Sequence, residues 1–324
     1  MMTDHEAQVA WRLFTLNWIP LGLMGLTLAL CLALTGFSIR PESLLLPFGA
    51  AALFGGVAYF YALARRRDAL VSFMLGSTAQ LVLIAVLMPP LTYIAAAAGL
   101  PMQDANLAHL DRMLGLDWRA YFNFIYDRPA LIPYMSLGYA MIVWPMFVIP
   151  IVLGMARQYR RLQQFTLACA LTLIVTTVIS TLLPAIGTYY EYGIMPDLSK
   201  FNPGGYLVQL QDLPLVRDGS LRVLDITQLG GIITFPSFHA AAAVLFLWAL
   251  WSVWWMRPLA LIANAGMLLA TPMAGGHYFV DVFAGIAVAV LAIAAAKRLG
   301  ARLTQGVRAP LAAMSMPEAA VPAE

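Results

Sequence analysis

Long apolar stretches alternate with short polar stretches along most of this chain. A hydrocarbon layer of about 30 Å needs roughly 20 apolar residues in each helix that crosses it. The pattern therefore predicts eight membrane-spanning helices, at residues 13–37, 44–64, 70–97, 130–155, 163–187, 235–256, 258–275 and 278–296. We expect an all-α, polytopic membrane protein.

Composition supports a membrane protein, and the first apolar run does not fit a cleaved secretory signal. The chain is 61% hydrophobic and only 11% charged, whereas soluble globular proteins carry about 25% charged residues. The first apolar run is longer than the core of a secretory signal, and acidic Asp4 and Glu6 precede it, so we interpret it as a retained helix. A membrane is the expected environment, and no nucleic-acid partner is expected.

Charge is distributed unevenly between the two sides of the predicted bundle. With eight spans, the side that carries both termini holds twelve of the 19 basic residues, while the opposite side holds eleven of the 16 acidic ones. Basic loops stay in the cytoplasm. The sequence therefore predicts cytoplasmic termini in a multi-pass cell membrane, the inner membrane if the source is a bacterium, with any chemistry on the periplasmic or exterior side.

The same pattern divides the chain into three parts. Residues 1–69 form an N-terminal tail and two additional helices, 70–303 a six-helix core, and 304–324 an Ala- and Pro-rich tail expected to be disordered. Two outward segments are long. Residues 98–129 are expected to form an interfacial helix, and residues 188–234 a turn-rich loop over a site.

Two of the four histidines are placed for chemistry. His5 and His109 lie in polar segments, where a solvated surface role is the simplest interpretation. His239 and His277 each follow a Gly-Gly pair, and each opens a predicted helix on the outward side. Pro236 suits the first turn of the earlier helix. Helix N-termini carry unpaired N–H groups, so two of them facing one space predict an anion site.

Spacing suggests how these groups would act. His277 and Asp281 are four residues apart, which places them on one helical face. The carboxylate would orient the imidazole and leave its other nitrogen free to attack an electrophile. His239 would protonate the leaving oxygen. The set is sufficient for phosphoryl transfer, so we expect neither a metal nor another cofactor.

Three other interpretations stay open at this point. Histidines at a membrane interface can be simple polar anchors. Two histidines and an aspartate are also a possible iron or zinc ligand set, although the neighbouring glycines and arginines suit an anion better. A transporter or a non-catalytic lipid-binding protein would use the histidines differently, but transporters place ionisable groups near the midplane, often with broken helices.

Two short motifs resemble those of a known family. "FPSFH" and "GGHYFVD" are similar to the second and third signatures of the type-2 phosphatidic acid phosphatase superfamily, Pro-Ser-x-His and His-x-x-x-Asp, and the resemblance covers roughly residues 70–298. It implies that His277 becomes phosphorylated, that Asp281 supports it, and that His239 protonates the leaving group. It also implies that Ser237 hydrogen-bonds the phosphate.

Two cationic positions of the family pattern are replaced. Arg128 and the proline after it match the end of the first signature, but Tyr121 stands where the family has Lys. Ala270 and Thr271 stand where the third signature begins Ser-Arg. This pattern is more similar to the inositolphosphorylceramide synthase-like branch, which transfers a phospho-headgroup between sphingolipids or phospholipids. The predicted phosphate-binding residues are Ser237, Arg128, Arg217, Arg222 and Gly276.

The expected function is a membrane phosphotransferase. It would move a phosphate or phospho-headgroup from a lipid-anchored donor to a lipid alcohol through a phosphohistidine. If water is the acceptor, the same residues make a lipid phosphate phosphatase that releases inorganic phosphate.

Overall fold

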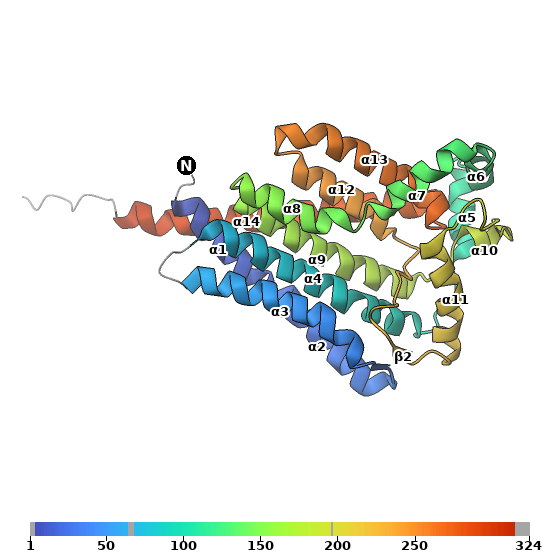
Figure 1. Cartoon of the computed structure of the whole chain (residues 1–324), viewed down its shortest axis with the longest axis horizontal. Helices are drawn as coiled ribbons and strands as arrows, with labels where there is room; N and C mark the ends of the chain where they lie inside the picture. Colours follow the sequence, from blue (N-terminus) through green and yellow to red (C-terminus); the bar gives the residue numbers. More distant parts are fainter. Residues whose placement is uncertain (1–3, 64–67, 196, 315–324) are drawn as a thin grey trace, which may run out of the picture.

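A computed structural model describes residues 4–63, 68–195 and 197–314 (Figure 1). Its α-helices, in chain order, are α1 (Asp4–Leu16), α2 (Trp18–Thr35), α3 (Glu42–Leu63), α4 (Ala69–Ala96), α5 (Asp104–Met113), α6 (Trp118–Tyr126), α7 (Ile132–Ala140), α8 (Trp144–Met155), α9 (Tyr159–Leu182), α10 (Thr188–Tyr192), α11 (Gly204–Asp218), α12 (Phe238–Leu250), α13 (Arg257–Ala274) and α14 (Phe279–Met314). Strands β1 (Ser38–Ile39) and β2 (Val223–Leu224) pair in parallel. The all-α membrane fold predicted from the sequence is confirmed.

The long helices run side by side along the molecule, and the short ones gather at one end (Figure 1). That end holds α5, α6, α10 and α11, while α1 and the last turns of α14 lie at the other. The six spans predicted for the core correspond to α4, the α7–α8 pair, α9, α12, α13 and α14. The division of the chain into three parts stays a prediction.

Fewer helices than predicted are long and apolar enough to span a membrane. In the described part of the chain five pass that test, and a sixth is added when α7 and α8, bent by 59°, are taken as one broken span. The expectation of eight uniform spans was too simple. Helix α12 has 13 residues, about 20 Å at 1.5 Å per residue, because the chain enters it from an irregular segment. Helix α13 carries Asn264 and Pro272 within its apolar sequence.

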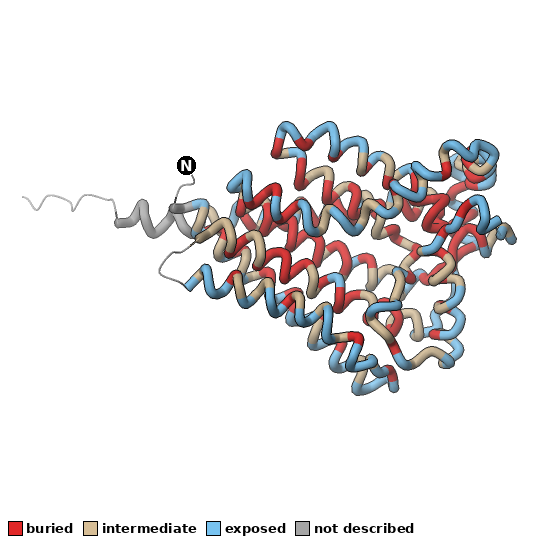
Figure 2. The backbone as a smooth tube through the Cα atoms, viewed as in Figure 1, coloured by how far each residue is buried: buried red, intermediate tan, exposed pale blue. Residues whose placement is uncertain are grey.

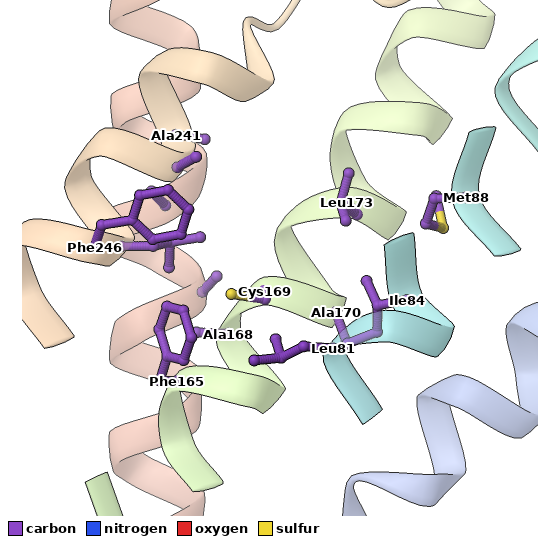
Figure 3. Packing of buried hydrophobic residues seen from close by; sticks show 14 of the residues in the cluster. Leu81, Ile84, Met88, Phe165, Ala168, Cys169, Ala170, Leu173, Ala241 and Phe246 are labelled. Atoms are coloured by element: carbon purple, nitrogen blue, oxygen red, sulfur yellow. The ribbon is translucent and has the colours of Figure 1, made fainter. Parts of the chain in front are cut away.

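Apolar packing between α4, α9 and α12 forms the centre of the bundle. Figure 3 shows Ile84 of α4, Leu173 of α9 and Phe246 of α12 among the buried side chains of this cluster. Buried residues line the inner faces of the helices, and exposed residues line the outer faces (Figure 2). Many of the exposed residues are large and apolar, such as Leu45 and Leu46, as expected of surfaces that contact lipid tails.

The N-terminal helix is embedded in the bundle. Val9 and Leu13 of α1 are buried against Leu299 and Leu303 of α14. At the junction of α1 and α2, Asn17 donates from Nδ2 to the backbone oxygen of Gln163 in α9 at 3.1 Å. Helix α1 therefore packs directly on α9 and α14 of the core.

Three connecting segments differ from their predicted form. The single interfacial helix predicted over 98–129 is two helices, α5 and α6, because Gly115 adopts a left-handed φ of 73° between them. The segment 188–234 contains the helix α11 as well as turns. Helix α14 continues past residue 304 to Met314, so the start of the predicted disordered tail is helical, and residues 315–324 lie outside the described residues.

Candidate active site

Helix α12 begins at the residue before His239. Ser237 is its N-cap, and the Ser237 Oγ accepts a hydrogen bond from the Ala240 N–H at 3.4 Å. Pro236, expected in the first helical turn, precedes this cap and follows a cis peptide bond. The Ser237 N–H donates to the backbone oxygen of Asp281 at 3.0 Å. The start of α12 is thus fixed directly to the first turn of α14.

The predicted contact between His277 and Asp281 is present. The Nδ1 atom of His277 lies 3.3 Å from Oδ2 of Asp281, and both residues are buried. His277 itself precedes α14, which starts at Phe279; the pair meets across a helix start and not along a helix face. On the opposite side of the imidazole, Nε2 lies 3.4 Å from the Oγ of Ser237. One ring nitrogen faces a carboxylate and the other faces a hydroxyl.

The ring of His239 stacks on an aromatic ring from another helix. Tyr139 of α7 lies parallel to it, with ring centroids 3.8 Å apart and an interplanar angle of 12°. Stacking of this kind restricts the rotation of the imidazole. Tyr139 follows no signature spacing, so sequence reasoning did not find it.

The histidines His239 and His277 line one cavity of about 500 Å³. Its walls are mostly apolar and come from α4, α7, α8, α9, α11, the start of α12 and the segments before α12 and α14. Along α4 the lining runs from Thr78 to Thr92, roughly 20 Å of helix. At the break between α7 and α8 the lining includes Val143 and Phe147, which are 55% and 42% exposed. The cavity therefore extends from the imidazoles to the lipid-facing surface.

The N–H groups that open α14 are already used by the protein. Asp111 of α5 accepts from the Phe279 and Val280 N–H groups at 2.9 Å each. Asp281 accepts from the Tyr278 N–H at 2.8 Å. The expectation that this helix start offers free N–H groups to an anion is corrected: two carboxylates occupy them. Burial raises the pKa of Asp111, and its two backbone hydrogen bonds oppose that rise.

A third buried carboxylate braces the same region. Asp104 accepts from the N–H groups of Ile186 and Gly187, at distances of 2.8 to 3.1 Å, and from the Tyr278 hydroxyl at 3.0 Å. It thereby ties the α9–α10 connection to the residue that follows His277. No motif in the sequence singles out Asp104 or Asp111, because nothing in the sequence indicates these distant partners.

We expect Asp104→Asn to destabilise the fold. The uncharged amide oxygen accepts weaker hydrogen bonds than the carboxylate, and the amide NH₂ would face the Ile186 N–H that Oδ2 now accepts, at a cost of about 1–3 kcal/mol. Thermal unfolding of the detergent-solubilised protein measures the loss. Asp127→Asn, at an exposed position, is the matched control, and equal unfolding temperatures for the two variants would contradict the bracing role.

Burial also sets the protonation of His277. Its pKa is lowered to about 4, chiefly by burial, while a hydrogen bond with the Thr234 backbone acts in the opposite direction. The imidazole is therefore neutral near pH 7. A neutral ring with a free lone pair is the form that attacks an electrophile.

The predicted arginines lie outside the cavity lining. Arg128 donates to the Phe124 backbone oxygen at 2.7 Å, and its guanidinium covers the Phe124 ring. Arg217 donates to the Leu100 backbone oxygen at 2.9 Å. Arg222 stacks over an aromatic ring of the α2–α3 loop. The structure does not bring these three residues together with the histidines, and no Lys or Arg is among the described residues that line the cavity.

Gly276 has a backbone role beside the histidine. Its φ is 63°, and a side chain there would collide with the ring of Tyr206. Its carbonyl accepts from the Thr188 N–H at 2.9 Å. Gly275, next to it, lines the cavity. Across the described residues, no group of three His, Cys, Asp or Glu side chains is arranged to hold a metal ion.

Comparison with known proteins assigns the family. A family model described as PAP2 superfamily matches residues 105–295, more than half of the 324 residues. The chain belongs to the PAP2 superfamily. No curated protein and no solved structure matches it. The match includes all the residues of the two histidine motifs, but it begins after α4, although α4 forms one wall of the cavity.

Membership of the PAP2 superfamily supports lipid phosphatase or phosphotransferase activity. It does not separate the two reactions or the branches of the superfamily. Resemblance to the inositolphosphorylceramide synthase-like branch stays a prediction.

Proposed function

We propose that this PAP2 protein transfers a phospho-headgroup from a phosphodiester lipid to a lipid alcohol, through a phosphohistidine. The observation that carries this proposal is the lack of Lys and Arg among the described residues lining the cavity. A phosphomonoester carries a charge of about −1.5 to −2 at pH 7, whereas a phosphodiester carries one negative charge. A buried site with two imidazoles and one hydroxyl suits the single charge, because burying an uncompensated dianion is far more costly.

In the first step the Nε2 of His277 attacks phosphorus. The bond between phosphorus and the lipid oxygen breaks, and His239, protonated while the anionic phosphate lies beside it, gives that oxygen a proton. Asp281, on the Nδ1 side, holds the tautomer and stabilises the positive charge that develops on the imidazole. The hydroxyl of Ser237, 3.4 Å from Nε2, is placed to donate a hydrogen bond to a phosphate oxygen.

In the second step the acceptor alcohol attacks phosphorus. The now neutral His239 takes the proton of that alcohol, the nitrogen–phosphorus bond breaks, and His277 returns to its starting state. The apolar part of the cavity would hold the acyl chains, and the opening at Val143 and Phe147 would admit them from the bilayer. By the charge distribution of the loops, we place the site on the periplasmic or exterior side.

A transfer assay tests this function. Purified protein in lipid nanodiscs receives a phosphodiester lipid labelled in its headgroup, with or without ceramide or diacylglycerol. We expect label in a new lipid only when an acceptor is present. Phosphatidic acid serves as the phosphomonoester donor in parallel. Free inorganic phosphate from phosphatidic acid without transfer would establish the phosphatase instead, and lipid binding without turnover of either donor would indicate a non-catalytic protein.

A further inference from the structure

The loop between α2 and α3 pairs with the chain that leads into the candidate active site. β1 and β2 are parallel neighbours. The Ser38 N–H donates to the Arg222 backbone oxygen, and the Arg40 N–H donates to the Leu224 backbone oxygen, each at 2.9 Å. Leu224 is completely buried. The pairing of β1 with β2 is therefore part of the packed fold, because one of its residues lies in the core.

Side chains extend the contact beyond the strands. Arg40 Nη1 lies 3.5 Å from the Oδ2 of Asp225. The Ser43 hydroxyl donates to the Arg40 backbone oxygen at 2.7 Å and accepts from the Ile226 N–H at 3.2 Å. An exposed ion pair alone contributes little, but here it accompanies three hydrogen bonds between the same two segments.

The residue held by Arg40 also organises the turn that follows. Asp225 accepts through Oδ1 from the Thr227 N–H and hydroxyl, and its carbonyl accepts from the Leu229 N–H. A few residues later, Gly231 and Ile233 line the cavity. The loop contact thus fixes the first residue of the segment that becomes the cavity wall.

The other end of this wall segment is fixed independently. The Thr234 hydroxyl donates to the Ala185 backbone oxygen at 2.8 Å, and Gln209 donates to Thr234 and Ala185. Between these two attachments the chain from 225 to 234 contains neither helix nor strand. A segment without internal ladder hydrogen bonds keeps its course only if both of its ends are held.

We propose that the α2–α3 loop together with the start of α3, residues 36–43, positions the cavity wall 225–234 and thereby the lipid-binding part of the site. Arg40 and Ser43 are positioning residues that act through Asp225 and Ile226. This assigns to the two N-terminal helices a role in substrate binding, and its kinetic consequence rests on the proposed function.

The test removes the side-chain contacts of Arg40 and Ser43 and measures amide hydrogen exchange in the cavity wall 225–234. In nanodiscs, Arg40→Ala/Ser43→Ala is compared with Glu42→Ala, at the exposed first residue of α3, between the two substituted positions. We expect amide hydrogen exchange over residues 224–234 to rise about tenfold in the double variant and to stay at the wild-type rate in the control. Exchange that rises only at residues 224–227, or nowhere, would overturn the proposal.

Kinetic constants and a disulfide rescue distinguish a positioning role of residues 36–43 from a general loss of stability. We expect the double variant to raise KM for the lipid donor several-fold with little change in kcat, because the wall holds lipid and not the reacting atoms. Adding Ser38→Cys and Val223→Cys, which stand opposite each other in the paired strands, allows a disulfide. Under oxidising conditions it should restore both KM and exchange, and reduction should remove the effect.

The two proposals fail in different ways. If the wild-type protein turns over no lipid, the proposed function is wrong, and the exchange experiment still decides whether the loop holds the wall. If turnover is normal and the double variant leaves KM unchanged, the positioning role is wrong while the function stands.

Discussion

Replacing His277 with Gln should reduce lipid turnover by roughly 10⁴-fold or more, the loss typical of removing a covalent nucleophile. Glutamine has no lone pair of comparable basicity, so no nitrogen–phosphorus bond forms. Asp281 and Ser237 would lose their contacts with the imidazole, at 3.3 and 3.4 Å, but the apolar cavity would still bind lipid. Substrate affinity should therefore change much less than kcat.

Covalent labelling checks this expectation at the level of the intermediate. The wild-type protein, quenched during turnover of a donor labelled at phosphorus, should carry an acid-labile and alkali-stable label, as phosphohistidine does. His277→Gln should carry none. His109→Gln, at an exposed position in α5, is the matched control and should be labelled normally. Label or turnover that survives in His277→Gln would assign the nucleophile to another residue.

The sequence alone was sufficient for the parts of the site that depend on local spacing. His277 and Asp281 meet because four residues separate them, and the contact forms although His277 lies just outside the helix. His239 shares their cavity because both motifs open helices at the same end of the bundle. Apolar run length likewise predicted where the helices of the core lie.

The parts that the sequence could not supply depend on distant partners. Tyr139 meets His239 only because α7 crosses the start of α12. Asp104 and Asp111 brace the segment around His277 from α5, more than 160 residues away in the chain. The spacing of apolar residues along the chain gives no information on contacts between residues so far apart. Arg217 and Arg222 were predicted from charge and side, and Arg128 from the end of the first signature, but their guanidinium groups are held elsewhere by backbone oxygens or aromatic rings.

The short length of α12 follows from the path of the chain that precedes it. The chain before it is irregular because it forms a cavity wall, and non-helical backbone at membrane depth is tolerated where it is buried in protein or lines a cavity. Counting apolar residues assigned the whole run 235–256 to one helix. The structure shortens it at both ends, to Phe238–Leu250, and His239 in its first turn lines the cavity.

Replacing His239 with Gln should make the rate depend on the leaving group. For a lipid alcohol, which needs a proton as it departs, loss of the general acid should lower kcat/KM by roughly 10²–10⁴-fold. For a nitrophenyl phosphodiester, whose phenolate leaves without a proton, the first step should be nearly as fast as in the wild type. The ratio of the two rates is measured with His239→Gln and with the His109→Gln control. Loss of proton donation lowers only the rate with the lipid alcohol leaving group, whereas loss of binding lowers both rates.

The second step should then reveal the same histidine as a base. His239→Gln cannot take the proton of the acceptor alcohol, so the phosphohistidine formed from the nitrophenyl donor should accumulate. We expect a burst of nitrophenolate, close to one equivalent per protein, followed by slow turnover, and covalent label higher than in the wild type. Equal losses with both donors and no burst would show that His239 does not transfer protons. Its parallel stacking on Tyr139, with centroids 3.8 Å apart, would then be a packing contact only.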